Sequence, residues 1–110
     1  MDSVLIRVLL LLLLINFPAI SQERTVNMGG RKFNIFTAGI EKRSAGDPVV
    51  IFESGMGVDL QNWNKIMGRV SEFAPVFAYD RAGIGRSDKT YTLPTPKNVA
   101  ENLNLSKRFL

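Results

Sequence analysis

The stretch that most restricts the fold of this sequence is the unbroken apolar run Val49 to Phe52, which follows Pro48 and precedes a glycine-rich segment. A β-branched run without polar alternation is typical of a strand buried on both faces, as parallel strands are. Pro75 to Tyr79 is a second apolar run. Because two parallel strands need a crossover between them, we expect a strand, helix, strand unit.

The connecting segment carries the signals of that helix. Asp59 is a suitable N-cap for a helix over Leu60 to Glu72. Its apolar residues recur at helical spacing, and we interpret this stripe as core packing rather than as a ligand site. The stripe consists of Trp63, Ile66, Met67, Val70 and Phe73. The predicted fold class is therefore α/β, with at least two parallel strands.

Further elements flank this βαβ unit. Arg24 to Met28 and Lys32 to Thr37 alternate in part, and the two glycines between them predict a β-hairpin. Near the other end, Thr95 is a predicted N-cap followed by a proline, and Lys97 to Leu110 is expected to be helical. The apolar face of this helix would consist of Val99, Ala100, Leu103 and Leu110.

The N-terminus has the composition of a secretory signal peptide. A short segment carrying Arg7 precedes the leucine-rich run Val8 to Phe17, and Ala19 and Ser21 place small residues at the −3 and −1 positions of a cleavage site. We expect cleavage after Ser21, so that residues 1–21 are removed and residues 22–110 form an exported domain, periplasmic or secreted.

An uncleaved N-terminal anchor is the alternative. Asn16 and Pro18 interrupt the apolar run well before the roughly 20 residues that a membrane span needs, so no stable membrane span is expected after cleavage. The sequence has no cysteine, which excludes a disulfide framework within it.

Composition also limits the chemistry of the chain. The 110 residues contain no histidine and no cysteine, so they cannot by themselves form a Ser-His-Asp triad, a Cys-His pair or an imidazole or thiolate metal site. No metal and no cofactor is expected. The formal net charge is +4, and the basic residues are scattered, which argues against binding to nucleic acid.

The segment "YDRAGIGRSD", Tyr79 to Asp88, resembles a phosphate loop only superficially. A dinucleotide fingerprint requires glycine where Asp88 stands, and no Gly-Lys-Ser/Thr occurs in the sequence. We interpret the segment as a structural loop, in which Asp80 caps the loop with Arg81 as its partner. A catalytic carboxylate pair of Glu53 and Asp80 is therefore disfavoured. The residues assigned to the structural loop are Asp80, Arg81, Gly83, Gly85 and Ser87.

A second glycine-rich turn, Glu53 to Gly57, follows the first predicted parallel strand. Ligands of open α/β sheets bind at the carboxyl ends of the strands. Two glycines allow a sharp turn whose amide groups face a common point, where they can stabilise an anion. A tight turn without any ligand is the alternative for this motif.

Together the two loops carry a family resemblance. The stretch "VVIFESGMGVDLQNWNKIMGRVSEFAPVFAYDRAGIGRSD" resembles the N-terminal third of an α/β-hydrolase, and Asp80 to Ser87 is its most specific part. Many members have His-Gly in the first turn, whereas this sequence has Ser54-Gly55, which resembles a subgroup with Glu-Ser-Gly or Glu-Ala-Gly. The resemblance runs from about Glu23 to Leu110 and covers only the front of the family's domain.

This resemblance implies a partial hydrolase site. Met56, in the turn with Ser54, Gly55 and Gly57, would supply one oxyanion-hole amide, and the other would follow the nucleophilic serine of a G-x-S-x-G elbow. No serine of the sequence has that context. The nucleophile, acid and histidine are therefore expected beyond Leu110, with a small-molecule ester or amide as the substrate of the whole enzyme.

Two hypotheses follow. The first is an N-terminal fragment of an exported serine hydrolase, inactive as written and arising from a truncated reading frame. The second is a small secreted non-catalytic module that binds a partner through an exposed strand edge. In the family's sheet, Val49 to Phe52 lies between Pro75 to Tyr79 and the elbow strand, so its free edge would favour self-association and low stability.

Overall fold

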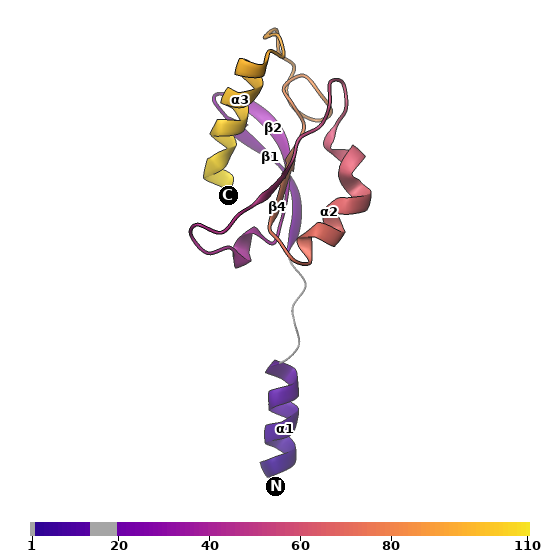
Figure 1. Ribbon diagram of the computed structural model, residues 1–110, viewed down its shortest axis with the longest axis vertical. Coiled ribbons are helices and arrows are strands. Elements are labelled where there is room, and N and C mark those ends of the chain that lie inside the picture. Colours follow the sequence, from indigo (N-terminus) through magenta and orange to yellow (C-terminus); the bar gives the residue numbers. More distant parts are fainter. Residues whose placement is uncertain (1, 14–19) are drawn as a thin grey trace.

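The computed structural model describes residues 2–13 and 20–110, which contain one four-stranded sheet in the order β1-β2-β4-β3 (Figure 1). The strands are β1 (Ser21–Met28), β2 (Arg31–Ala38), β3 (Val50–Phe52) and β4 (Val76–Tyr79). β2 is antiparallel to both β1 and β4, whereas β3 and β4 are parallel. The predicted α/β class, hairpin and parallel pair are confirmed.

The β1–β2 hairpin is longer at its open end than predicted, because Ser21 and Ala38 still pair. Gly29 and Gly30 form its turn with φ angles of 61° and 85°. Tight hairpin turns of this hand need positive φ at both central positions, which glycine adopts without a steric penalty.

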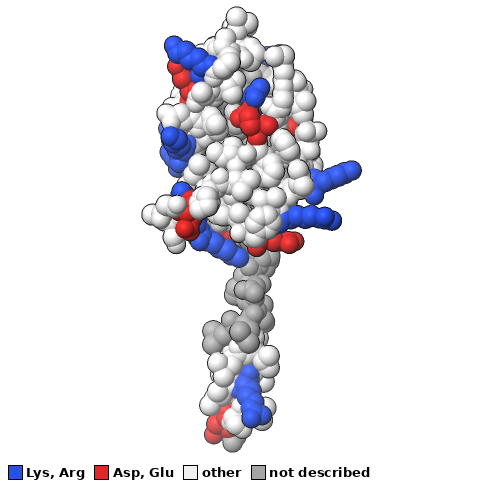
Figure 2. Space-filling view, viewed as in Figure 1, with Lys and Arg blue, Asp and Glu red and all other residues white. Residues whose placement is uncertain are grey.

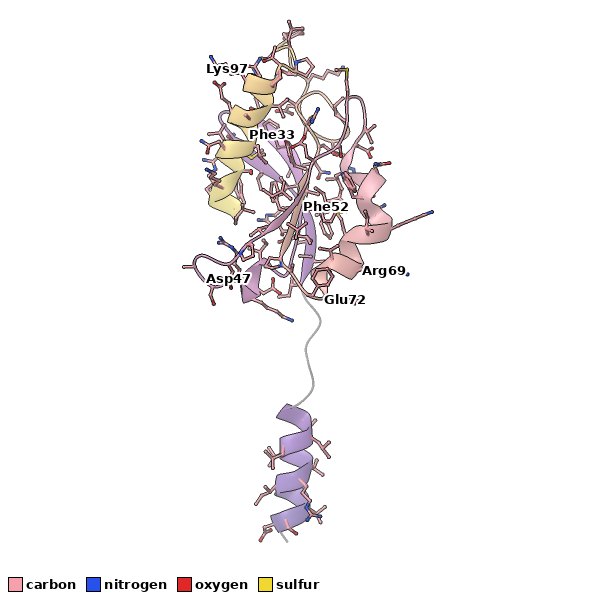
Figure 3. All side chains as sticks on the ribbon, viewed as in Figure 1. Phe33, Asp47, Phe52, Arg69, Glu72 and Lys97 are labelled. Atoms are coloured by element: carbon pink, nitrogen blue, oxygen red, sulfur yellow. The ribbon has the colours of Figure 1, made fainter. Side chains whose placement is uncertain are left out.

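Two helices cover opposite faces of the sheet. α2 (Asn64–Ser71) lies on one face and α3 (Pro96–Leu105) on the other, as Figure 1 shows. Successive strand residues point to opposite faces. The sheet therefore has an apolar cluster on each face. Phe52 belongs to the cluster that packs against α2, and Phe33 belongs to the cluster that packs against α3; both residues are labelled in Figure 3.

The helix predicted over Leu60 to Glu72 has two parts. Leu60–Trp63 is a 3₁₀ turn, which α2 continues to Ser71. The Asp59 cap is confirmed, because its Oδ1 atom accepts a hydrogen bond of 3.0 Å from the Gln61 amide. Trp63, Met67 and Val70 pack on the sheet, as the stripe predicted. The same prediction was wrong for Ile66 and Phe73, which are 43% and 79% exposed, since this short helix contacts the sheet along a narrow stripe.

The C-terminal helix begins as predicted. Thr95 Oγ1 accepts a hydrogen bond of 3.3 Å from the Asn98 amide, and Pro96 is the first helical residue. α3 ends at Leu105, and a 3₁₀ turn (Ser106–Phe109) replaces the last turn of the predicted helix. Ala100 is exposed, contrary to prediction, because Leu103, Phe109 and Leu110 make the contact with the sheet. An unpredicted 3₁₀ turn, Ile40–Lys42, follows β2.

The two parallel strands differ in burial. All four residues of β4 are buried, but in β3 only Phe52 is buried and Ile51 is 39% exposed. β3 pairs with β4 on one side, and no other strand of the described residues borders it. The prediction that the run Val49 to Phe52 is buried on both faces is therefore wrong.

The N-terminal helix α1 (Asp2–Leu13) lies apart from the sheet in Figure 1. The part of the predicted signal peptide over residues 14–19 lies outside the described residues, and the predicted cleavage point follows Ser21, the first residue of β1. Within residues 2–13 and 20–110, no helix has both the length and the apolar character needed to cross a membrane.

Candidate active site

The glycine-rich turn after β3 is closed by a hydrogen bond that does not involve the Met56 amide. The Val58 amide donates to the Gly55 carbonyl over 3.2 Å, and Gly57 has φ of 74°. A type II turn requires a positive φ angle at its third residue, and this requirement favours glycine there. Because the turn uses the Val58 donor, the Met56 amide is not consumed in closing it. The Met56 side chain is 81% exposed.

Ser54 holds this turn to the following helix. Its side chain is buried, its Oγ donates to the Asp59 carbonyl over 3.1 Å, and Trp63 Nε1 donates to the same Oγ over 3.1 Å. Trp63 also packs against Phe52, with ring centroids 5.2 Å apart. The sequence indicated only a core role for Trp63, and its hydrogen bond to Ser54 was not predicted.

Glu53 joins the ends of the two parallel strands. Arg81 Nε donates to Glu53 Oε1 over 2.5 Å, and the Tyr79 hydroxyl donates to Oε2 over 2.7 Å. Burial raises the pKa of Tyr79 far above its usual value, and the hydrogen bond to Glu53 and its negative charge raise that pKa further. The predicted partnership of Asp80 with Arg81 is wrong, because Arg81 bonds Glu53 and both carboxylate oxygens of Asp80 bond other groups.

Asp80 is instead buried, at 2% exposed, and joins several segments of the chain. Its Oδ1 accepts from the Leu60 amide over 2.7 Å. Its Oδ2 accepts from Asn34 Nδ2 and from the Arg86 amide, each over 3.0 Å. The bond to Arg86 closes the loop on itself, whereas the contacts with Asn34 and Leu60 were not predicted. With both oxygens engaged, Asp80 has a structural role, and Glu53 and Asp80 do not form a free carboxylate pair.

The remaining loop residues attach the loop to β2. Ser87 Oγ donates to the Asp80 carbonyl over 2.6 Å and accepts from the Asn34 amide over 2.9 Å. Gly83 and Gly85 have φ of 82° and 54°, and the Gly83 amide donates to the Asp88 carbonyl over 2.8 Å. Ser87 is buried and doubly hydrogen-bonded, so it is not placed to act as a nucleophile.

A pocket of about 350 Å³ lies at the carboxyl ends of the parallel strands, between the loops and α3. It brings together Met56, Gly57, Arg81 and Gly83 from the predicted site. Ser54, Gly55, Asp80, Gly85 and Ser87 do not line it; they support the loops around it. Met56, whose amide does not close its own turn, is thus one of the residues that line this small-molecule-sized pocket.

The charged side chains near the site form no evident cluster on the face that Figure 2 shows. In Figure 2, Lys and Arg are scattered over the face shown. In the part of the chain that the structure describes, no group of three or more Asp or Glu residues could hold a metal ion. The candidate site in the described residues therefore consists of the Met56 turn and the pocket wall, with Glu53 bonded to Arg81 behind that wall.

No family model matches the sequence. The curated proteins include the uncharacterized protein YqjL of Bacillus subtilis (strain 168), to which the chain is 28% identical over 81 residues. That match covers 74% of this chain and 30% of YqjL.

Solved structures of similar fold include a bacterial membrane phospholipase A (TM-score 0.65, 24% identity, 76% of this chain and 26% of that one). The thioesterase domain from the curacin biosynthetic pathway has a TM-score of 0.65 at 19% identity, with coverage of 83% and 33%. Epoxide hydrolase A from Mycobacterium thermoresistibile has a TM-score of 0.64 at 22% identity, with coverage of 77% and 26%.

The chain thus spans a third or less of the length of each of these proteins. Identities this low establish likeness of fold only. The three solved structures have the α/β-hydrolase fold, and the described chain matches about a quarter to a third of each of them. The described chain therefore has part of an α/β-hydrolase fold.

Proposed function

We propose that this chain supplies the oxyanion-hole turn and part of the substrate pocket of a serine hydrolase that cleaves small-molecule esters or amides. The observation that carries the proposal is the Met56 amide, which the turn leaves unused, beside a pocket of about 350 Å³ at the carboxyl ends of β3 and β4. In acyl transfer, such an amide stabilises the negative charge that develops on the carbonyl oxygen. The similar folds of a phospholipase and a thioesterase support this chemistry.

The bond-breaking groups must come from residues other than these 110. The sequence has no histidine to act as a general base. Its two serines near the site, Ser54 and Ser87, are buried and hydrogen-bonded. We therefore expect the 110-residue chain alone not to hydrolyse esters.

The test is made on the protein isolated from its source with an antibody against residues 22–110. It should react with a fluorophosphonate probe, hydrolyse a chromogenic short-chain ester, and contain a G-x-S-x-G segment by mass spectrometry. Isolation of a chain no heavier than 12.3 kDa, the mass of the 110 residues, that neither reacts nor hydrolyses would overturn the proposal.

The role of Met56 has its own matched pair of variants in that protein. Met56→Pro removes the amide hydrogen and should lower kcat by about 10²–10³-fold, the usual effect of losing an oxyanion donor. Met56→Ala keeps the amide and removes only the exposed side chain, so kcat should stay within about threefold of the original. Equal losses in both variants would contradict an oxyanion role for the amide.

We also propose that the protein is exported, with removal of residues 1–21. The exposed apolar side chains between residues 4 and 12 support this, because they belong to neither core cluster of the described residues. N-terminal sequencing of the protein from the medium or periplasm should begin at Gln22. A mature protein that begins at Met1 would overturn the proposal.

A second candidate function is a binding module that adds a strand of a partner to β3. The free outer edge of β3 favours it, since such an edge presents unpaired backbone groups. The reading frame after codon 110 distinguishes the candidates: a G-x-S-x-G elbow within about 40 codons favours the hydrolase, and non-coding sequence favours the module.

A further inference from the structure

We propose that the pocket beside Met56 takes ligands that join an apolar segment to a carboxylate, and that Arg31 binds the carboxylate. This inference rests on the proposed function in treating the pocket as a substrate site. The binding step itself requires no hydrolysis, so the two can fail separately.

Arg31 reaches the pocket because of the strand order. It is the first residue of β2, and β2 is antiparallel to β4, so Arg31 lies at the edge where β4 ends. The half-buried Arg31 side chain lines the pocket. Its Nη1 donates to Thr90 Oγ1 over 2.6 Å, and its Nη2 donates to Thr92 Oγ1 over 3.2 Å. These two hydroxyls hold the guanidinium in place and leave further N–H donors of its fork for a ligand.

The charge of Arg31 is not neutralised by a neighbouring acid. Among the described residues near this site, Arg81 forms an ion pair with Glu53 and Lys97 forms one with Glu101. Neither ion pair includes Arg31. No Asp or Glu lines the pocket. Glu101 and Arg31 both line a second pocket of about 200 Å³. The Glu101 carboxylate, however, lies 3.9 Å from Lys97 Nζ and so pairs with Lys97 rather than with Arg31. The pocket therefore presents one uncompensated positive charge.

The rest of the lining is mainly apolar. Ile84 and Val99 lie in its wall, and Tyr91 and Leu93 line it while remaining 106% and 73% exposed. A volume of about 350 Å³ is at the small end of ligand sites. A single planar guanidinium matches a singly charged planar carboxylate better than a phosphate dianion, which would need more positive charge. A short-chain or medium-chain carboxylate fits these features.

The test is calorimetric titration of the 110-residue chain with octanoate and with 1-octanol. Octanoate should bind more tightly than octanol, and its affinity should fall as salt is added. Arg31→Met should weaken octanoate binding by about tenfold or more, as expected for loss of a charged hydrogen bond, and should leave octanol binding unchanged. Arg31→Lys, which keeps the charge but not the fork, should give an intermediate affinity.

Arg24→Met is the matched control. Arg24 is also half-buried and also donates to a threonine hydroxyl, Thr37 Oγ1, over 3.2 Å, but it does not line the pocket. Octanoate affinity should be unchanged in this variant. Circular dichroism confirms that each variant is folded before titration. No octanoate binding by the original chain, equal binding of octanol, or equal losses in the Arg31 and Arg24 variants would each overturn the inference.

Discussion

A Cβ atom on Gly85 would lie 2.4 Å from Asp80 Oδ2, so the buried carboxylate and the backbone of position 85 can share this space only while that residue is glycine. The φ angle of Gly85, 54°, adds a second requirement for glycine. Glycine at position 85 is thus needed for Asp80 to keep its hydrogen bonds.

Gly85→Ala should destabilise the chain by about 3 kcal/mol, because it combines positive φ with displacement of Asp80. Gly46→Ala is the matched control: Gly46 has φ of 89°, but its Cβ would meet nothing within 4 Å, so a cost of about 1 kcal/mol is expected. Urea unfolding followed by Trp63 fluorescence measures both. Equal losses of unfolding free energy in the two variants would show that Asp80 can move aside without cost, which would contradict the steric role of Gly85.

Asp80→Asn should destabilise the chain by about 2–4 kcal/mol. An amide NH₂ at either oxygen position would face N–H donors, namely those of Leu60 or those of Asn34 and Arg86, and would leave them buried without an acceptor. Asp88→Asn is the control, because Asp88 is exposed and its carboxylate accepts a single hydrogen bond, from the Lys32 amide. Its cost should stay below about 1 kcal/mol. Similar costs for both substitutions in urea unfolding would refute the role of Asp80 in joining these segments.

Ser54→Ala should cost about 1–2 kcal/mol and change the emission of Trp63, since Trp63 Nε1 and the Asp59 carbonyl both lose their partner. Ser71→Ala removes an exposed hydroxyl that donates within α2, to Gly68, and should cost at most about 0.5 kcal/mol. Thermal unfolding and fluorescence spectra compare the two. An unchanged Trp63 spectrum in Ser54→Ala would contradict the contact.

Tyr79 should make stability fall in alkali. Burial, then the bond to Glu53, raises its pKa in the folded chain, whereas an unfolded tyrosine loses its proton near pH 10. The stabilisation by neutral Tyr79 is therefore complete below about pH 10 and is lost as pH rises toward the folded-state pKa. The unfolding free energy of the original chain minus that of Tyr79→Phe should decrease by about 1.4 kcal/mol per pH unit above pH 10. A difference that stays constant from pH 8 to pH 12 would contradict the raised pKa.

The free edge of β3 should pair with a second copy of the chain. Sedimentation equilibrium is expected to show a mass that rises with concentration, and Ile51→Lys should suppress this rise, because a charge on an edge strand opposes pairing. Phe73→Lys is the control, since Phe73 is more exposed, at 79%, but lies outside the sheet. A concentration-independent monomer, or suppression by Phe73→Lys alone, would refute edge pairing.

The sequence predicted those elements that depend on neighbouring residues. The caps at Asp59 and Thr95, the hairpin turn and the two parallel runs all follow from local chemistry, and the structure contains each of them. Local sequence patterns failed to predict burial where it depends on how much of a helix the sheet covers. Ile66, Phe73 and Ala100 are apolar at helical spacing, yet they lie beyond the contact with the sheet.

The site was predicted less completely, because its contacts join distant segments. Asp80 bonds Asn34 across 46 positions and Leu60 across 20, and Arg31 bonds Thr90 across 59. No spacing rule links such pairs. The Asp80–Arg81 pairing, which adjacency in the sequence favoured, was wrong because Arg81 points toward Glu53.

The strand order β1-β2-β4-β3 also determines when the sheet can form as the chain is made. The β1–β2 hairpin has both partners once residue 38 has emerged, but β3 emerges before β4, its only neighbour among the described strands. At roughly 5–20 residues per second, this apolar segment waits for a time on the order of seconds. We expect that interval to be when a nascent chain most needs a chaperone.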